Sequence, residues 1–154
     1  MSAPPSLEVF LHNRVGRKGV PMRRSFERWI RAALRGRHAG RATIAVALLD
    51  EADARALNRQ FRGRDYATNV LSFPHETIDG RRTRMLGDLA LCPKVIAREA
   101  RAQGKPLRNH FAHLTVHGTL HLIGYDHEKT RDAERMEAIE RSVLAGLGIP
   151  DPYA

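Results

Sequence analysis

A chain of 154 residues, 42% of them hydrophobic, is long enough to bury a core, and we expect one domain over residues 1–154. No apolar run approaches the ~18 residues of a membrane span, and Met1–Ser6 lacks the apolar segment of a signal peptide, so we expect a cytoplasmic protein without membrane contact. The single cysteine, Cys92, excludes an internal disulfide, and its apolar neighbours indicate a buried side chain rather than a metal ligand.

The net charge of +9 belongs to one segment near the N-terminus. Residues 13–41 contain ten Lys or Arg residues and one acidic residue, whereas the rest of the chain contains sixteen of each. Helical spacing turns five apolar residues of this segment toward the core: Phe26, Trp29, Ile30, Ala33 and Leu34. Four arginines then align on the outer face: Arg24, Arg28, Arg31 and Arg35. Such a stripe suits a phosphate backbone, but it also fits an ordinary solvated face, and both interpretations stay open.

The order of the elements predicts strands and helices in alternation, followed by helices alone. The expected strands are Leu7–Leu11, Thr43–Leu49, Asn69–Phe73 and Leu86–Cys92. Asp50 can cap a helix that runs through Phe61, with Ala54, Leu57 and Phe61 on its inner side. Asp79-Gly80 is expected to form a turn in the polar stretch between the last two strands.

Three further helices are expected in the second half of the chain. They cover Pro93–Gln103, then a stretch from Pro106 in its first turn to Leu122, and finally about Arg131–Ala145. We therefore predict an α+β fold: a single domain with a small mixed four-stranded sheet, packed with about five to six helices.

Three histidines stand at H-x3-H-x5-H spacing on the late helix and the turn after it: His117, His121 and His127. The first two are four residues apart, so on a helix their rings lie one above the other. Gly124 is the residue type that most easily ends a helix in a left-handed conformation, and the turn can bring His127 back toward the same point. The spacing therefore predicts that three imidazoles bind one metal ion.

Three neutral imidazoles with an open fourth position are typical of a catalytic zinc site, although nickel or another divalent ion would accept similar ligands. The H-E-x-x-H-x-x-G-x-x-H zinc peptidases share this spacing, but Gly118 stands where those enzymes carry their general-base glutamate. Peptide hydrolysis by that mechanism is therefore disfavoured. Glycine costs about 1 kcal/mol relative to alanine inside a helix, so we expect either close packing or passage of a substrate at Gly118.

Three segments resemble the signature regions of the YbeY family, in the same order and with the same spacing. They are Leu57–Pro74 (LNRQFRGRDYATNVLSFP), Leu86–Cys92 (LGDLALC) and Ala112–His127 (AHLTVHGTLHLIGYDH). The resemblance covers nearly the whole domain. It implies a metal-dependent, single-strand-specific endoribonuclease that acts as a ribosomal RNA maturation factor.

The resemblance also implies roles for particular residues and partners. His117, His121 and His127 match the zinc ligands of the family, and Arg62 matches its arginine near the metal, which is thought to contact the scissile phosphate. A guanidinium there can pair with two phosphate oxygens. The implied partners are ribosomal RNA, especially the 3′ end of the small-subunit RNA, and a ribosomal protein or assembly GTPase. The family also helps to remove defective ribosomes.

Two other classes of function stay open on the sequence alone. One is a ribosome-assembly or RNA-binding factor with a structural metal, and the other is a metallohydrolase of the H-x3-H-x5-H type that acts on another substrate. Four residues keep alternative interpretations. Asp126 could orient an imidazole or cap a turn, Asp88 could lie near the metal or pair with a buried arginine, and His110 and His113 could extend the stripe of histidines.

Overall fold

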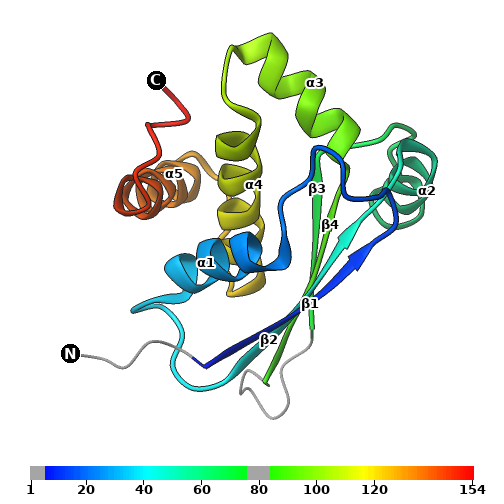
Figure 1. Cartoon of the computed structure of the whole chain (residues 1–154). Coiled ribbons are helices and arrows are strands. Elements are labelled where there is room, and N and C mark those ends of the chain that lie inside the picture. The colour runs from blue at the N-terminus through cyan, green and yellow to red at the C-terminus, as the bar shows by residue number, and fades with distance from the viewer. Residues whose placement is uncertain (1–5, 76–83) are drawn as a thin grey trace.

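Four strands form one mixed sheet in the computed structural model, which describes residues 6–75 and 84–154 (Figure 1). Their order across the sheet is β1 (Leu7–Asn13), β2 (Ala42–Leu48), β4 (Met85–Leu91) and β3 (Val70–Pro74). The pairs β1–β2 and β2–β4 are parallel, whereas β3 runs antiparallel to β4. Strand β3 therefore lies at one edge of the sheet, where it can form the wall of a site.

Five helices accompany the sheet in the described part of the chain. They are α1 (Arg23–Leu34), α2 (Glu51–Arg62), α3 (Pro93–Gln103), α4 (Leu107–Leu122) and α5 (Thr130–Gly146). Helix α4 is central, since it packs on β3 and β4 and also contacts α1, α3 and α5. Helix α2 lies apart from α1, α4 and α5 in Figure 1 and packs beside the start of α3 through Ala54, Cys92 and Val95. None of the described helices is long and apolar enough to cross a bilayer.

The core confirms the helical period predicted for the basic segment. All five apolar residues assigned to the inner face of α1 are buried, and the rings of Phe26 and Trp29 meet edge to face at 5.6 Å. Cys92 is fully buried, as expected. Ten of the sixteen residues of α4 are buried, including Phe111, Leu114 and Leu122, so this helix is covered on most of its surface.

The observed bounds agree with the expected ones to within two residues. The Asp50 side chain caps α2 by accepting a hydrogen bond from the Asp53 amide at 2.8 Å. Pro106 precedes the first residue of α4, because its extended ψ of 136° places it at the N-cap rather than in the first turn. The turn expected at Asp79-Gly80 lies outside the described residues.

The inner side of α2 differs from the prediction. Ala54 is buried and Leu57 is half-buried, but Phe61 is 55% exposed and Asn58 takes the buried position. The Asn58 side chain donates to the carbonyl oxygen of Tyr66 at 2.8 Å, which satisfies the buried amide. The last turn of α2 extends beyond the core, and the Phe61 ring lies at the surface, where it meets Phe73 edge to face at 5.2 Å.

Candidate metal centre and the cleft around it

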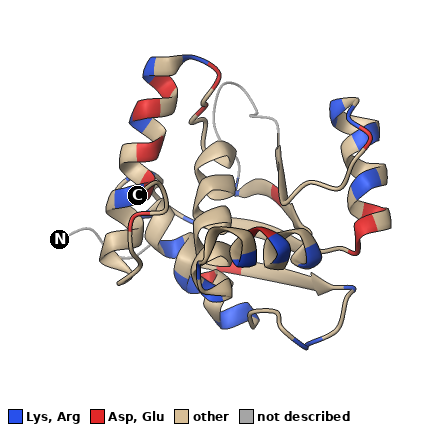
Figure 2. Cartoon of the chain, turned by 90° about the horizontal axis from the view of Figure 1, so that it is seen from above, with Lys and Arg blue, Asp and Glu red and all other residues tan. Residues whose placement is uncertain are grey.

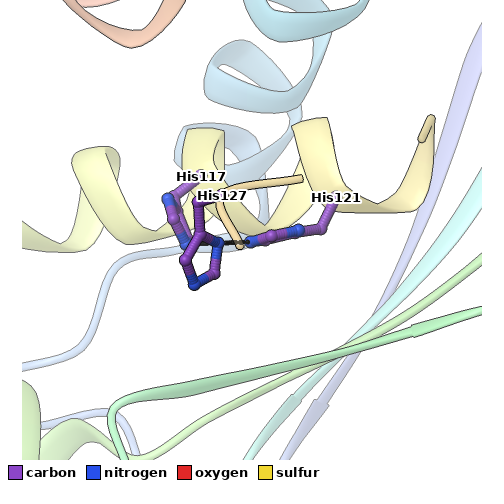
Figure 3. Close-up of side chains that lie close together, drawn as sticks. All are labelled: His117, His121 and His127. Atoms are coloured by element: carbon purple, nitrogen blue, oxygen red, sulfur yellow. Dashed lines mark hydrogen bonds between the residues drawn. The ribbon is translucent and has the colours of Figure 1, made fainter. Parts of the chain in front are cut away.

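Helix α4 carries the first two histidines of the motif on its half-buried side. Their Nε2 atoms are 3.1 Å apart, as expected for residues separated by one helical turn. The His127 Nδ1 atom lies 3.0 Å from the His121 Nε2 atom. Figure 3 shows the rings of His117 and His121 on the helix, with His127 approaching from the segment that follows.

Gly124 makes this approach possible. Its φ of 102° falls in the region that favours glycine, and its amide donates to the His121 carbonyl at 3.1 Å. The Tyr125 amide donates to the Leu120 carbonyl at 3.0 Å, which completes the reversal of the chain at the end of the helix. The left-handed turn predicted at Gly124 is confirmed, and it brings His127 back to the helix.

The three histidines could hold one metal ion, because their donor atoms all lie within 4.8 Å of one another. Within residues 6–75 and 84–154, no fourth His, Cys, Asp or Glu belongs to this group. Three nitrogen donors without a fourth protein ligand fit a divalent ion that retains an exchangeable position.

A buried carboxylate supports this cluster from behind. Glu140 of α5 is fully buried, and its Oε1 atom lies 2.8 Å from the Nδ1 atom of His117. Oε1 also lies 3.1 Å from the Nε2 atom of His113, and the hydroxyl of Tyr153 donates to Oε2 at 2.8 Å. A neutral His117 that donates from Nδ1 presents the lone pair of Nε2 to the other two histidines. Glu140 thereby fixes the tautomer and the orientation of this ring.

The pKa shifts of three groups around the cluster favour an ionised Glu140, a neutral His121 and a protonated Tyr153 hydroxyl. Burial by itself would raise the pKa of Glu140, but hydrogen bonds from His113, His117 and Tyr153 lower the pKa to about 2, so the carboxylate stays ionised. Burial is the main cause that lowers the pKa of His121 to about 4, and the electrostatic influence of the neighbouring His117 and His127 rings adds to it. Burial and the bond to Glu140 raise the pKa of Tyr153 well above its usual value, so its hydroxyl remains a donor.

The packing around Gly118 explains why the peptidase glutamate has no counterpart here. A Cβ atom built on Gly118 would lie 2.8 Å from Leu89 Cδ2 and 3.2 Å from Ser72 Oγ. The Ser72 hydroxyl also donates to the Gly118 carbonyl at 3.3 Å. Of the two reasons expected for this glycine, close packing is therefore the one observed, since side chains of the sheet leave little room for one at this position of the helix.

Arg62 and the three histidines line the same cleft, which we call the histidine cleft. It has a volume of about 860 Å³ and lies between α4, the end of α2, strand β3 and the loop between them. Arg62, the last residue of α2, makes a long hydrogen bond of 3.4 Å from Nη2 to the Ser72 carbonyl. Phe61, Arg64 and Tyr66 also line the cleft, so guanidinium groups and exposed aromatic rings face the histidines.

The structure shows the hydrogen-bond partners of the four residues whose roles were left open, Asp88, His110, His113 and Asp126. His113 faces the histidine cleft but bonds Glu140, whereas His110 turns away and lies 2.9 Å from Glu99. Asp126 accepts a hydrogen bond from the His127 amide at 2.7 Å, which supports the turn. Asp88 pairs with His75 at 3.1 Å.

Glu140 and Tyr153 were missed from the sequence. A signal existed for Glu140, because it lies one turn from Met136 and one turn from Leu144 on the buried side of α5. A carboxylate at such a position requires a partner. Tyr153 lies beyond the last helix, where no periodicity places its side chain.

Comparison with known proteins gives a consistent answer. The family model described as Endoribonuclease YbeY matches residues 12–148. The protein named Endoribonuclease YbeY from Alkalilimnicola ehrlichii is 56% identical over 140 residues, covering 89% of this chain and 84% of that protein. Its namesake from Stenotrophomonas maltophilia is 51% identical and covers 98% of this chain and 96% of its own length. The solution structure of TM1509 from Thermotoga maritima superposes with a TM-score of 0.61 at 25% identity, over 92% of both chains.

Proposed function

Because this chain belongs to the Endoribonuclease YbeY family, whose members are hydrolases that act on RNA, we propose that it is a zinc-dependent endoribonuclease with its active site in the histidine cleft. The observation that carries the proposal is the meeting of two groups from distant segments. The three histidines come from α4 and the turn after it, whereas Arg62 comes from the end of α2, and all four residues line one cleft.

In this proposal, His117, His121 and His127 hold the zinc ion, or another divalent ion of similar preference. When bound, such an ion polarises a phosphoryl oxygen and lowers the pKa of a water molecule toward ~7. Glu140 keeps the His117 ring in the orientation that presents its Nε2 atom to the cluster.

Arg62 is the residue that binds the scissile phosphate. Phosphodiester cleavage gathers negative charge on the oxygens around phosphorus, and a guanidinium can meet two of those oxygens at once. Among the described residues, Arg62 makes one hydrogen bond, which is long and uses one of its five N–H donors on the Ser72 carbonyl, so most of the group is left for a substrate. Arg64, which lines the same cleft, adds a second positive charge for the RNA backbone.

Two exposed aromatic rings support a preference for single strands. Phe61 and Tyr66 are 55% and 50% exposed and line the histidine cleft. Unpaired bases can stack on such rings, at about 1–3 kcal/mol per base, whereas the bases of a duplex are already stacked on one another. A single strand could therefore place its bases on these rings and its phosphates near the arginines.

The natural substrate in this proposal is ribosomal RNA, in particular the 3′ end of the small-subunit RNA, which places the enzyme in the cytoplasm and in ribosome quality control. The support is the resemblance of three signature segments, Leu57–Pro74, Leu86–Cys92 and Ala112–His127, together with the net charge of +9. A ribosomal protein or an assembly GTPase is the kind of partner that would bring the enzyme to this RNA.

The proposal is tested by cleavage of a labelled single-stranded RNA by the purified protein. We expect cleavage that stops with a chelator and returns when zinc is added. His121→Ala should lose both the metal and the activity, and a duplex of the same sequence should be cut more slowly. Cleavage that persists in a protein shown by elemental analysis to be metal-free would contradict a catalytic metal. A metal-loaded protein that binds the RNA without cutting it would favour a structural metal.

A further inference from the structure

A second pocket, lined by arginines, lies between α1 and α5. Its volume is about 390 Å³, and it is lined by Arg28, Arg31, Arg35 and Arg37 on one side and by the last turns of α5, including Ser142, on the other. We call it the arginine pocket. It shares no residue with the histidine cleft, so its arginines are separate from Arg62 and Arg64.

The charges of this pocket are not neutralised by acids within residues 6–75 and 84–154. Arg28, Arg31 and Arg35 have no carboxylate partner there, and the acid of α1, Glu27, pairs with Arg23 instead. Arg37 donates to the carbonyl oxygens of Ala33 and Arg35, which holds its guanidinium near the other three. Figure 2 shows Lys and Arg gathered along α1, whereas α5 carries both signs of charge.

The helix ends are too weak to compensate. The pocket lies near the C-terminal turns of α1 and α5, and each helix C-terminus carries the equivalent of about half a negative charge. Two such ends oppose four guanidinium groups, which leaves roughly three positive charges. The end of α5 is also partly satisfied by the amides of Leu147, Gly148 and Ile149. Arg28 and Arg31 lie one turn apart on α1, and Arg35 follows at its C-cap, so like charges lie close together and an anion that enters the pocket would stabilise it.

We propose that the arginine pocket binds the phosphodiester backbone of the RNA at a distance from the cleavage site. The proposal rests on the proposed function, since it takes RNA as the substrate. Arg28 and Arg35 are seven residues apart, which is about 10 Å along the helix. A stretch of this length can lie against more than one phosphate of a single strand. Each planar guanidinium can bind two phosphate oxygens, so this surface holds the backbone without reading its bases.

An acidic protein segment would meet the same charges. RNA is favoured because phosphates recur at a regular spacing along every strand, which suits a row of arginines on one helix face. The pocket thereby gives the enzyme a second hold on a long RNA that a short oligonucleotide cannot reach.

The test removes three positive charges at two places. One variant combines Arg28→Gln, Arg31→Gln and Arg35→Gln, and the matched control combines Arg14→Gln, Arg17→Gln and Lys18→Gln, which are exposed in the loop before α1. Binding of a long single-stranded RNA is measured against salt concentration in the presence of chelator, and cleavage of a short oligonucleotide is measured with zinc. Poly-L-glutamate serves as the acidic protein probe.

The pocket variant should bind the long RNA roughly tenfold more weakly. The slope of log K against log salt should fall by about 2, because each phosphate that the protein no longer neutralises lowers the slope by about 0.7. Cleavage of the short oligonucleotide should stay at the wild-type rate, and the control variant should resemble the wild type in both assays. Circular dichroism melts verify that both variants are folded.

If both variants lose the same affinity for the long RNA, the effect depends on net charge alone and the proposal is overturned. Unchanged affinity for the long RNA, combined with lost binding of poly-L-glutamate, would reassign the pocket to an acidic protein. If the wild type fails to cut the short oligonucleotide, the proposed function fails, while the comparison of salt slopes still decides whether the pocket binds RNA.

Discussion

Glu140 is a carboxylate that the fold surrounds completely and then supplies with hydrogen-bond donors. Removing a charge from such a position affects every partner, because His113, His117 and Tyr153 all direct a polar atom at it. Glu140 is not one of the residues whose donor atoms form the candidate metal group, so it is a positioning residue that acts through the His117 ring. Partners of this kind typically contribute about 10–100-fold to metal affinity.

We predict that Glu140→Gln binds zinc about 10–100-fold more weakly, because the amide cannot attract the His117 N–H as an ionised carboxylate does. Competition with a chromophoric chelator measures the affinity. Glu134→Gln, an exposed change on the same helix, is the control and should bind like the wild type. If Glu140→Gln lowers the thermal stability of the metal-free protein but keeps the wild-type affinity, its role is structural only.

Substitutions of Arg62 can separate the effect of its positive charge from the effect of its planar shape. Arg62→Ala should keep its zinc and lose cleavage by about a hundredfold or more, a size typical of the loss of one group that stabilises transition-state charge. Arg62→Lys should recover only part of the rate, because an ammonium keeps the charge but not the planar fork. Single-turnover cleavage and elemental analysis measure the two quantities. Arg59→Ala, in the same helical turn, should cleave normally, and a normal rate in Arg62→Ala would remove this residue from the mechanism.

At the scale of elements, α4 and the strands beside it meet at Gly118. An alanine there gains about 1 kcal/mol of helix propensity, but its methyl group would lie 2.8 Å from Leu89 Cδ2 in a close-packed core. Overpacking of this kind costs about 1–3 kcal/mol, so the steric effect exceeds the gain in propensity.

Gly118→Ala should therefore lower the free energy of unfolding by roughly 1 kcal/mol, as measured by urea denaturation. Gly146→Ala is the matched control, since a Cβ atom there meets no atom within 4 Å. That control should be neutral or stabilising, by up to about 1 kcal/mol. Equal stabilisation by both changes would mean that the sheet does not restrict α4 at this point.

At the scale of the whole molecule, the metal would connect α4 to the segment after it and so stabilise the folded chain. At a free zinc concentration a thousand times the dissociation constant, binding adds about 4.1 kcal/mol. For a domain of this size, that corresponds to a rise in Tm of about 8–16 °C.

We therefore expect chelation to lower Tm by about that amount, as followed by calorimetry. His127→Ala should melt near the chelated wild type and respond little to added zinc. His12→Ala, a change at an exposed residue of β1, should behave like the wild type. If the wild type has the same Tm with chelator as it has with saturating zinc, the cluster does not bind the ion tightly.

The part of the site that could be predicted consists of residues that lie close together in the sequence. Helical period and a left-handed glycine bring His117, His121 and His127 together, because these rules act over one or two turns. The same rules failed for Phe61, whose apolar spacing continues after the core has ended. The contact between His117 and Glu140 joins residues 23 positions apart on different helices, and no local rule reaches that far.

The sheet, too, was predictable in part. Aliphatic runs placed the four strands to within two residues, and the predicted mixed sheet of an α+β domain is confirmed. The position of β3 at the edge, antiparallel to β4, could not be predicted, because pairing depends on how the connections cross the sheet. That position decides which strand forms the wall opposite the histidines.

Ser72 of β3 links both sides of the histidine cleft. Its carbonyl accepts from Arg62, and its hydroxyl donates to the Gly118 carbonyl in the turn of α4 between His117 and His121. The arginine and the helix that carries the imidazoles are therefore hydrogen-bonded to the same residue. Through these two hydrogen bonds, of 3.4 Å and 3.3 Å, a displacement of β3 would act on both the arginine and the helix that carries the imidazoles. A substrate held between the arginine and the imidazoles would therefore depend on the position of one edge strand.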